Sequence, residues 1–147
     1  SGILMEAIPL RIINFFQEHH VLTLATSVGN NPYCANCFYV YDGDEALIFA
    51  SEEHTKHIQD AFQNKQVAAS VVLETKIIGE IQGVQLCGEL EELEGEELQS
   101  ANKIYLKAFP DAVLKSTPLW VIRVSYIKMT DNRLGFGTKL IWGSLTA

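Results

Sequence analysis

Residues 21–50 read VLTLATSVGNNPYCANCFYVYDGDEALIFA, and this stretch constrains the fold more than any other part of the sequence. Residues 21–26 and 33–41 are rich in β-branched and aromatic side chains, which favour strands, and a Gly-Asn-Asn-Pro turn separates them. The turn-forming residues 42–44 then lead into the apolar run 46–50. The stretch therefore predicts three consecutive strands joined by tight turns.

The residues on either side of this stretch predict helices and further strands. Before it, Ile8, Ile12, Phe15 and Phe16 recur at helical spacing, and Pro9 suits the first turn of a helix. The patterns after it predict strands at 67–73, 80–93, 119–129 and 138–142, and helices at 58–64 and 98–109.

Two of these strands carry more specific signals. Gly83 and Gly88 interrupt the strand 80–93, which indicates a bulge, a bend or a close approach at those positions. In the strand that begins at residue 119, simple alternation places Trp120 and Tyr126 on the same face.

About six strands with few helices and short turns are typical of a small antiparallel barrel. The chain of 147 residues is long enough to bury a core without disulfides. We therefore expect a mainly β fold, an antiparallel β-barrel with peripheral helices, formed as a single domain over residues 1–147.

The composition argues against several classes of function. Eleven Lys and Arg against 18 Asp and Glu give a net charge of −7, which disfavours nucleic acid as a partner because phosphate binding needs a basic face. No apolar run approaches the roughly 20 residues that span a bilayer, and no charged region followed by an apolar one resembles a signal peptide. Three cysteines cannot all pair, which favours a reducing compartment. We expect a cytoplasmic protein that binds neither nucleic acid nor membrane.

The hydropathy indicates a partner of another kind. A mean hydropathy of +0.09 is high for a chain with a net charge of −7. Apolar surface buried against another chain would explain this combination, and exposed strand edges of a small barrel favour the same arrangement. We therefore expect a dimer.

Cys34 and Cys37 have the spacing of zinc and redox motifs, but their setting differs. A zinc site needs four ligands, and no second Cys-x-x-Cys or nearby Cys/His pair follows. A redox Cys-x-x-Cys normally opens a helix, whereas this one lies in an expected strand. We interpret both cysteines as structural, place Cys87 in the core, and expect no metal site. The sequence also has no nucleophile elbow, dinucleotide-binding or P-loop motif.

The polar stretch after the strand 46–50 says most about a possible binding site. It brings together Ser51, Thr55, Lys56 and His57 where a helix begins. Backbone N–H groups at a helix start attract anions, and Lys56 adds a positive charge, which together indicate a phosphate site. The alternative is an ordinary helix start, in which Ser51 or Thr55 caps the helix and Lys56 is solvated.

The order of these pieces carries more information than any single motif. In sequence they are LTLAT at 22–26, an aromatic strand reaching Tyr41-Asp42-Gly43, LIFAS at 47–51, Thr55-Lys56-His57, and IQGVQLCG at 81–88. Over roughly residues 7–130, this order resembles the pyridoxamine 5′-phosphate oxidase-like family of FMN-binding split barrels, and within it a compact bacterial branch.

The resemblance implies a six-stranded antiparallel split β-barrel that forms a homodimer and holds FMN at the dimer interface. The positions that match the family's phosphate-binding residues are Ser51, Thr55, Lys56 and His57. The positions that match its ring and ribityl contacts are Ala35, Asn36, Cys37, Phe49, Ala50 and Gln85, with Gln82 as the alternative to Gln85. Trp142 matches an aromatic residue that covers the site from the partner subunit; the alternative is a core or dimer-interface tryptophan.

Departures from the family pattern restrict which reaction the resemblance implies. Cys34 stands where pyridoxamine phosphate oxidases have an arginine, and Tyr39 falls near the position of their substrate-contacting lysine. The stretch 133–137 does not reproduce their C-terminal signature. The resemblance therefore implies an FMN-dependent oxidoreductase acting on another small molecule with its own electron donor, rather than vitamin B6 oxidation.

Two other functions remain open on the same barrel. One is a non-catalytic carrier or sensor that binds a flavin, a deazaflavin or haem. For haem, His19, His20, His54 and His57 offer axial ligands, although none has a distinguishing setting. The other is a dimeric barrel that has lost its cofactor.

Overall fold

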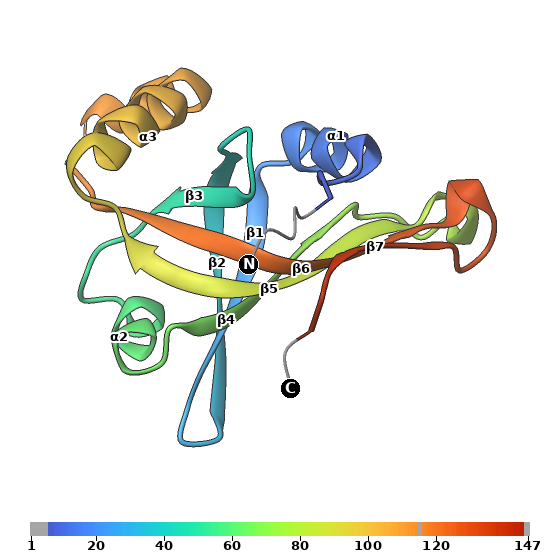
Figure 1. Cartoon of the computed structure of the whole chain (residues 1–147), viewed down its shortest axis with the longest axis horizontal. Coiled ribbons are helices and arrows are strands. Elements are labelled where there is room, and N and C mark those ends of the chain that lie inside the picture. Colours follow the sequence, from blue (N-terminus) through green and yellow to red (C-terminus); the bar gives the residue numbers. More distant parts are fainter. Residues whose placement is uncertain (1–5, 115, 146–147) are drawn as a thin grey trace.

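The computed structural model describes residues 6–114 and 116–145 (Figure 1). Within them the elements follow in the order α1 (Leu10–Glu18), β1 (Val21–Val28), β2 (Asn31–Tyr41), β3 (Ala46–Ala50), α2 (Lys56–Gln63), β4 (Gln66–Val72), η1 (Ile78–Glu80), β5 (Gln82–Glu92), α3 (Gly95–Ala108), η2 (Pro110–Leu114), β6 (Leu119–Asp131), η3 (Asn132–Leu134) and β7 (Lys139–Gly143). No helix in the described residues is long and apolar enough to cross a membrane.

The strands close into an antiparallel barrel. Their order is β3-β2-β1-β4-β5-β6-β7, and a further pairing of β3 with β6 closes β1 to β6 into a ring. The first half of β6 pairs with β3, whereas its second half continues past the ring and pairs with β7. The expected six-stranded split barrel is therefore confirmed, and β7 is a seventh strand added to it (Figure 1).

A bulge in β6 changes which of its side chains enter the core. Cys87 of β5 pairs with Tyr126, but the next residue, Gly88, pairs with Val124, so Ser125 is an extra residue in β6. Because a bulge inserts one residue, the side chains beyond it change face. The prediction that Trp120 and Tyr126 lie on the same face is therefore wrong. Beyond the bulge, Ile127 and Met129 are the buried residues. The bulge expected at Gly88 is confirmed.

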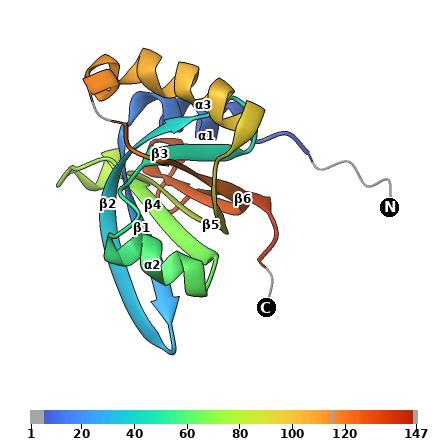
Figure 2. The same ribbon diagram turned by 90° about the vertical axis from the view of Figure 1, so that its left-hand side faces the viewer.

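Helices cover the barrel on different sides. Figures 1 and 2 show α1 and α2 on opposite sides of it, with α3 outside β3. Ile12, Phe15 and Phe16 of α1 join the main core inside the barrel, beside Tyr39 and Tyr41 of β2. A second, smaller core lies under α3 and consists of Ala46, Ile48, Leu93, Ala101, Tyr105, Leu119 and Val121.

Candidate functional site

The loop between β3 and α2 is fixed at its first residue by β6. The backbone N–H of Ser51 donates to the carbonyl of Pro118 (3.2 Å), and the Ser51 carbonyl accepts from the indole N–H of Trp120 (2.8 Å). Trp120 is itself buried in the barrel. The Ser51 side chain is therefore held in one place at the end of β3.

Two hydroxyls meet the imidazole of His57. Ser51 Oγ lies 2.8 Å from Nε2 of His57, and Thr55 Oγ1 lies 3.4 Å from the same atom. Burial lowers the pKa of His57, and the charge of Asp60 opposes this change. The ring is therefore neutral at neutral pH. In the tautomer that leaves Nε2 unprotonated, the Ser51 hydroxyl donates to it.

Lys56 is paired within the protein. Its ammonium nitrogen lies 2.9 and 3.2 Å from the two carboxylate oxygens of Asp60, whose residue is only 5% exposed. The hydrogen bond from Lys56, with that from the Thr26 hydroxyl (2.9 Å), holds the pKa of Asp60 below its usual range. Nζ also lies 5.0 Å from the centre of the Tyr33 ring, a cation–π distance. An incoming anion must therefore share Lys56 with Asp60.

The helix α2 begins without a side-chain cap. Thr55 occupies the capping position, but its hydroxyl donates to the carbonyl of Glu52 (2.8 Å) and makes no bond to a helix N–H. The backbone N–H groups of the first turn consequently retain their capacity to bind an anion. We call Ser51, Thr55, Lys56 and His57 the loop cluster. The side chains of Ser51, Thr55 and His57 meet, and Lys56 lies next to them in the chain with its ammonium group on Asp60.

The strand β2 brings Cys37 to this cluster. Cys37 is buried, which raises the pKa of its thiol, and the nearby Ser51 hydroxyl opposes the rise. Ala35 lies on the same face of β2, two residues away. Phe49, on β3, is fully buried, so only its backbone is placed to touch a ligand, whereas Ala50 is half-buried at the strand end.

Asn36 and Gln85 lie on the other face, in a row of polar residues across five strands. The row follows the register from Asn36 on β2 through Thr23, Ser70 and Gln85 to Lys128 on β6. Directly paired residues share a face and lie about 5 Å apart. The Thr23 hydroxyl donates to the Asn36 carbonyl oxygen (2.9 Å). We call this set the outer polar row; sequence reasoning missed three of its members because their alignment depends on the strand register.

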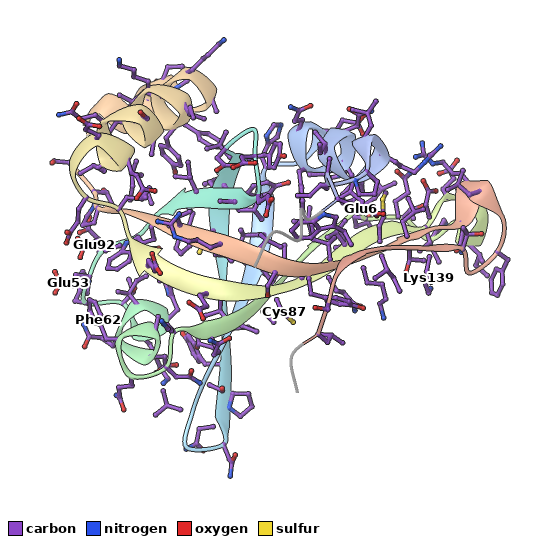
Figure 3. The ribbon with its side chains drawn as sticks, viewed as in Figure 1. Glu6, Glu53, Phe62, Cys87, Glu92 and Lys139 are labelled. Carbon is purple, nitrogen blue, oxygen red and sulfur yellow. The ribbon has the colours of Figure 1, made fainter. Side chains whose placement is uncertain are left out.

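A row of small residues runs beside the outer polar row. It follows the register from Cys34 through Ala25 and Ala68 to Cys87. Cys87 is half-buried and projects from the middle of β5 (Figure 3), so placing it in the core is wrong. Along β5 up to the bulge, the even-numbered residues point into the barrel. Cys87 has an odd number, so its side chain points outward. Small side chains thus lie next to the polar ones on this outer face of the barrel.

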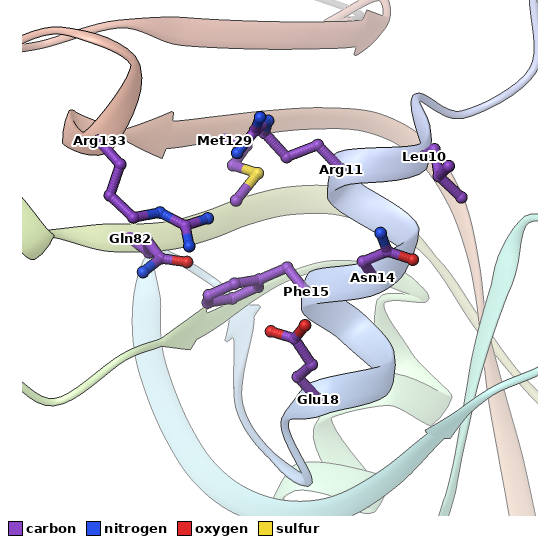
Figure 4. Close-up of a pocket in the computed structure, with 8 residues that line it drawn as sticks. All are labelled: Leu10, Arg11, Asn14, Phe15, Glu18, Gln82, Met129 and Arg133. Atoms are coloured by element: carbon purple, nitrogen blue, oxygen red, sulfur yellow. The ribbon is translucent and has the colours of Figure 1, made fainter.

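Two further sequence-predicted residues, Gln82 and Trp142, also lie away from the loop cluster. Gln82, the alternative to Gln85, is buried at the start of β5 and lines a groove beside α1 (Figure 4). Trp142 of β7 is buried in the main core of its own subunit, and its indole N–H donates to the carbonyl of Glu6 (2.6 Å). This placement favours the core interpretation of Trp142 over a role in covering the site.

The histidines have separate surroundings. Nδ1 of His19 lies 2.8 Å from the carbonyl of Phe15 at the end of α1, His20 packs against Phe109, and His54 is exposed. Within residues 6–114 and 116–145, no group of three or more His, Cys, Asp or Glu side chains is placed to hold a metal ion.

Comparison with known sequences identifies close relatives. No protein-family model matches the chain. A UPF0306 protein of Photorhabdus laumondii is 42% identical over 132 residues, which cover 89% of this chain and 92% of the relative. A UPF0306 protein of Yersinia pestis is 42% identical over 134 residues, which cover 90% and 91%.

Solved structures of other proteins share the fold. A heme-binding protein from Mycobacterium smegmatis superposes with a TM-score of 0.73 at 22% identity, over 88% of this chain and 55% of that one. An FAD-binding protein from Mesorhizobium loti gives 0.69 at 19%, over 86% and 97%. A protein of Listeria innocua provisionally identified as a pyridoxamine 5′-phosphate oxidase gives 0.65 at 16%, over 81% and 94%. The fold is thus the split barrel of pyridoxamine 5′-phosphate oxidase-like proteins.

Proposed function

This chain belongs to the UPF0306 family, and we propose that it binds FMN and acts as a flavin-dependent oxidoreductase on a small-molecule substrate. The observation that carries the proposal is the loop cluster. It places two hydroxyls, a lysine, an imidazole and an uncapped helix start at the end of a barrel strand. In a chain with a net charge of −7, such a concentration of donors fits the phosphate of a mononucleotide.

Each residue of the loop cluster can offer a hydrogen bond to the phosphate. The hydroxyls of Ser51 and Thr55 can turn from His57 and Glu52 toward an anion, because each has a single rotatable proton. Lys56 keeps one N–H beyond the two that face Asp60. His57 becomes a donor when it gains a proton, which a neighbouring phosphate favours.

The edge of β2 offers hydrogen bonds to the polar edge of a flavin ring. β1 pairs with β2 from Asn31 to Phe38, but β3 pairs with β2 only from Tyr39 onward. In an antiparallel ladder alternate residues direct N–H and C=O away from the paired strand. Around Ala35, Asn36 and Cys37 those groups therefore have no second strand partner within the described residues. When bound, FMN supplies the hydride and electron transfer, and this chain positions it and limits solvent access.

The substrate we propose is not a vitamin B6 phosphate. Tyr39, near the position of the family's substrate lysine, is 1% exposed, and its hydroxyl donates to the Phe16 carbonyl (2.7 Å) inside the barrel. Cys34, in place of the arginine, is exposed and lacks the fork of N–H donors that a guanidinium offers a phosphate. Neither residue is suited to hold the substrate's phosphate.

We further propose that a second copy of the chain covers the outer face that carries the outer polar row and the row of small residues, and completes the site. The row of small residues lets another surface approach the sheet backbone closely. Val21 and Phe38, directly paired on the same sheet, are 48% and 60% exposed. Large apolar side chains left open in this way favour burial against a partner.

A carrier or sensor of haem is the second candidate, because a heme-binding protein shares the fold. Its best axial-ligand candidate is His19, because a bond from Nδ1 to the Phe15 carbonyl leaves Nε2 available for iron. At His57, by contrast, Nε2 faces the Ser51 hydroxyl and must break that hydrogen bond to bind iron.

The visible spectrum of the purified protein separates these functions. We expect flavin bands, after reconstitution with FMN where needed, that bleach with a reduced nicotinamide. A Soret band, or flavin without turnover, supports the carrier or sensor instead. A colourless protein that takes up neither FMN nor haem contradicts both.

A matched pair of lysine variants tests the phosphate assignment. Lys56→Ala removes a donor that is partly engaged by Asp60, so we expect FMN affinity to fall about tenfold. Lys65→Ala is the control, since Lys65 is equally exposed, is also paired with an acid, and lies outside the loop cluster. Equal FMN affinity in the Lys56 variant and the wild type would show the assignment to be wrong.

A further inference from the structure

A groove lies on the side of the barrel opposite α2, between α1 and the paired ends of β5 and β6 (Figures 1 and 4). Its volume is about 460 Å³, within the range of small-molecule sites. Arg11 of α1, Arg133 of η3 and Gln82 of β5 supply most of its hydrogen-bonding groups. We call it the arginine groove, because two of the three arginines in the chain meet there.

One buried carboxylate fixes both arginines. Arg11 Nη1 lies 3.0 Å from Asp131 Oδ2, and Arg133 Nη2 lies 2.9 Å from the same oxygen. Arg133 also donates to Oδ1 through Nε (3.1 Å) and its backbone N–H (3.0 Å). The Asp131 side chain is fully buried, so the two guanidinium groups are held in set orientations before any ligand arrives.

The charges at this end of the groove do not cancel. Arg11 and Arg133 carry two positive charges against the single charge of Asp131, and their side chains are 41% and 50% exposed. Arg11 spends one of its five N–H groups on Asp131, and Arg133 spends two, so the others have no acceptor within the described residues. Glu18, the acid in the lining, follows Arg11 by seven residues, about 10 Å along α1, and its charge also acts on Arg133. What the arginine end offers an anion is therefore its unused N–H groups rather than a net charge of the whole groove.

Gln82 adds a buried polar group that faces the same space. The residue is 8% exposed and lies directly opposite Asp131 in the β5–β6 ladder. Its amide nitrogen makes one long hydrogen bond, 3.4 Å to the Glu80 carbonyl, and within the described residues its carbonyl oxygen accepts none. Figure 4 shows the carboxamide turned into the groove. No buried side-chain oxygen of the described residues lacks a partner, so the Gln82 carbonyl oxygen opens to the groove, where a ligand or water can donate to it.

We propose that the arginine groove binds a small organic oxyanion, a carboxylate or a phosphate monoester, between Arg11 and Arg133, with a hydroxyl of the ligand donating to Gln82. Guanidinium groups suit both anions because their fork of N–H donors matches two oxygens at once. The rival explanation is purely structural: the two ion pairs fasten α1 and η3 to the end of β6.

A titration followed by ¹⁵N NMR decides between them in the wild-type protein. Sodium phosphate and sodium acetate are added separately, with sodium chloride holding the ionic strength constant. We expect one or both to cause saturable shifts of the Nε–H signals of Arg11 and Arg133 and of the Gln82 side-chain amide. The Nε–H of Arg123, an arginine of similar exposure paired with Glu91 and Glu97, is the internal control. Shifts that never saturate, or that are equal at Arg123, overturn the proposal.

Variants then test the residues. For the anion that gives saturable shifts, we expect Arg133→Gln to lower the binding affinity at least about tenfold, because a charge-assisted pair is lost. Arg123→Gln should leave the affinity for that anion unchanged. Gln82→Met, which keeps the volume, is the second variant and guards against misfolding of the first. A lower stability with unchanged anion affinity in both groove variants would establish the structural explanation and contradict ours.

Discussion

A close approach of β5 to β6 at Gly88 allows a stability prediction with a worked magnitude. A methyl group on Gly88 would lie 2.4 Å from the carbonyl oxygen of Arg123 and 3.1 Å from Cγ2 of Ile122. Carbon–oxygen contacts between strands normally lie at about 3.3–3.6 Å, so Gly88→Ala requires β5 and β6 to separate by roughly 1 Å beside the bulge. The obstacle is backbone, which cannot rotate away as a side chain does.

The expected loss is about 2 kcal/mol of unfolding free energy. Overpacking costs about 1–3 kcal/mol, and a clash with backbone takes the upper end of this range; the stiffer unfolded chain of an alanine variant then offsets about 0.4–1 kcal/mol. For a chain of about 150 residues, this lowers the melting temperature by roughly 4–8 °C.

Urea denaturation of two alanine variants measures this loss. Gly83→Ala is the matched control on the same strand, because its added methyl would meet its nearest atoms, the Val71 oxygen and Val72 Cγ2, at an ordinary 3.6 Å. We expect Gly83→Ala to stay within about 0.5 kcal/mol of the wild type. If Gly88→Ala is as stable as the wild type, or Gly83→Ala is the worse of the two, the close packing of β5 on β6 at the bulge is misplaced.

Three further outcomes follow from single contacts. Tyr39→Phe deletes the buried hydroxyl that bonds the Phe16 carbonyl and should cost about 1–2 kcal/mol in urea denaturation; an unchanged midpoint would show that the bond contributes nothing. The folded protein lowers the pKa of His57, so stability should rise with pH between the lowered value and the ordinary 6.5, and His57→Gln should flatten that dependence. Hydrogen bonds from Arg133 lower the pKa of Asp131, so its contribution is present above pH 3.8 and lost as the pH falls through the lowered value; Asp131→Asn should remove this part of the acid transition.

Local sequence signals were enough to find the elements and the loop cluster. Turn residues and β-branched runs located the hairpins, and helical spacing located α1. Ser51, Thr55, Lys56 and His57 are neighbours in sequence, so their meeting required only that a strand end and a helix begin between them. The ion pair of Lys56 and Asp60 could also have been predicted, because the two residues are four apart on a helix.

Features that depend on distant parts of the chain could not be read in this way. The outer polar row joins Asn36 to Lys128 through a register set by four strand pairings. The bulge at Ser125 reverses the faces of β6, and its only signal lay on the partner strand, at Gly88. Arg11 and Arg133 meet on one carboxylate although they are far apart in sequence. Tertiary packing, rather than local preference, decides each of these.

The central claim is that the loop cluster binds the phosphate of FMN, and the affinities of the wild-type protein for FMN and riboflavin test it most directly. The two ligands share the ring and the ribityl chain and differ only in the phosphate, so their ratio isolates the cluster's contribution. We predict that FMN binds at least about tenfold more tightly than riboflavin, since at least one charge-assisted hydrogen bond is at stake. Equal affinity for the two ligands would contradict the claim.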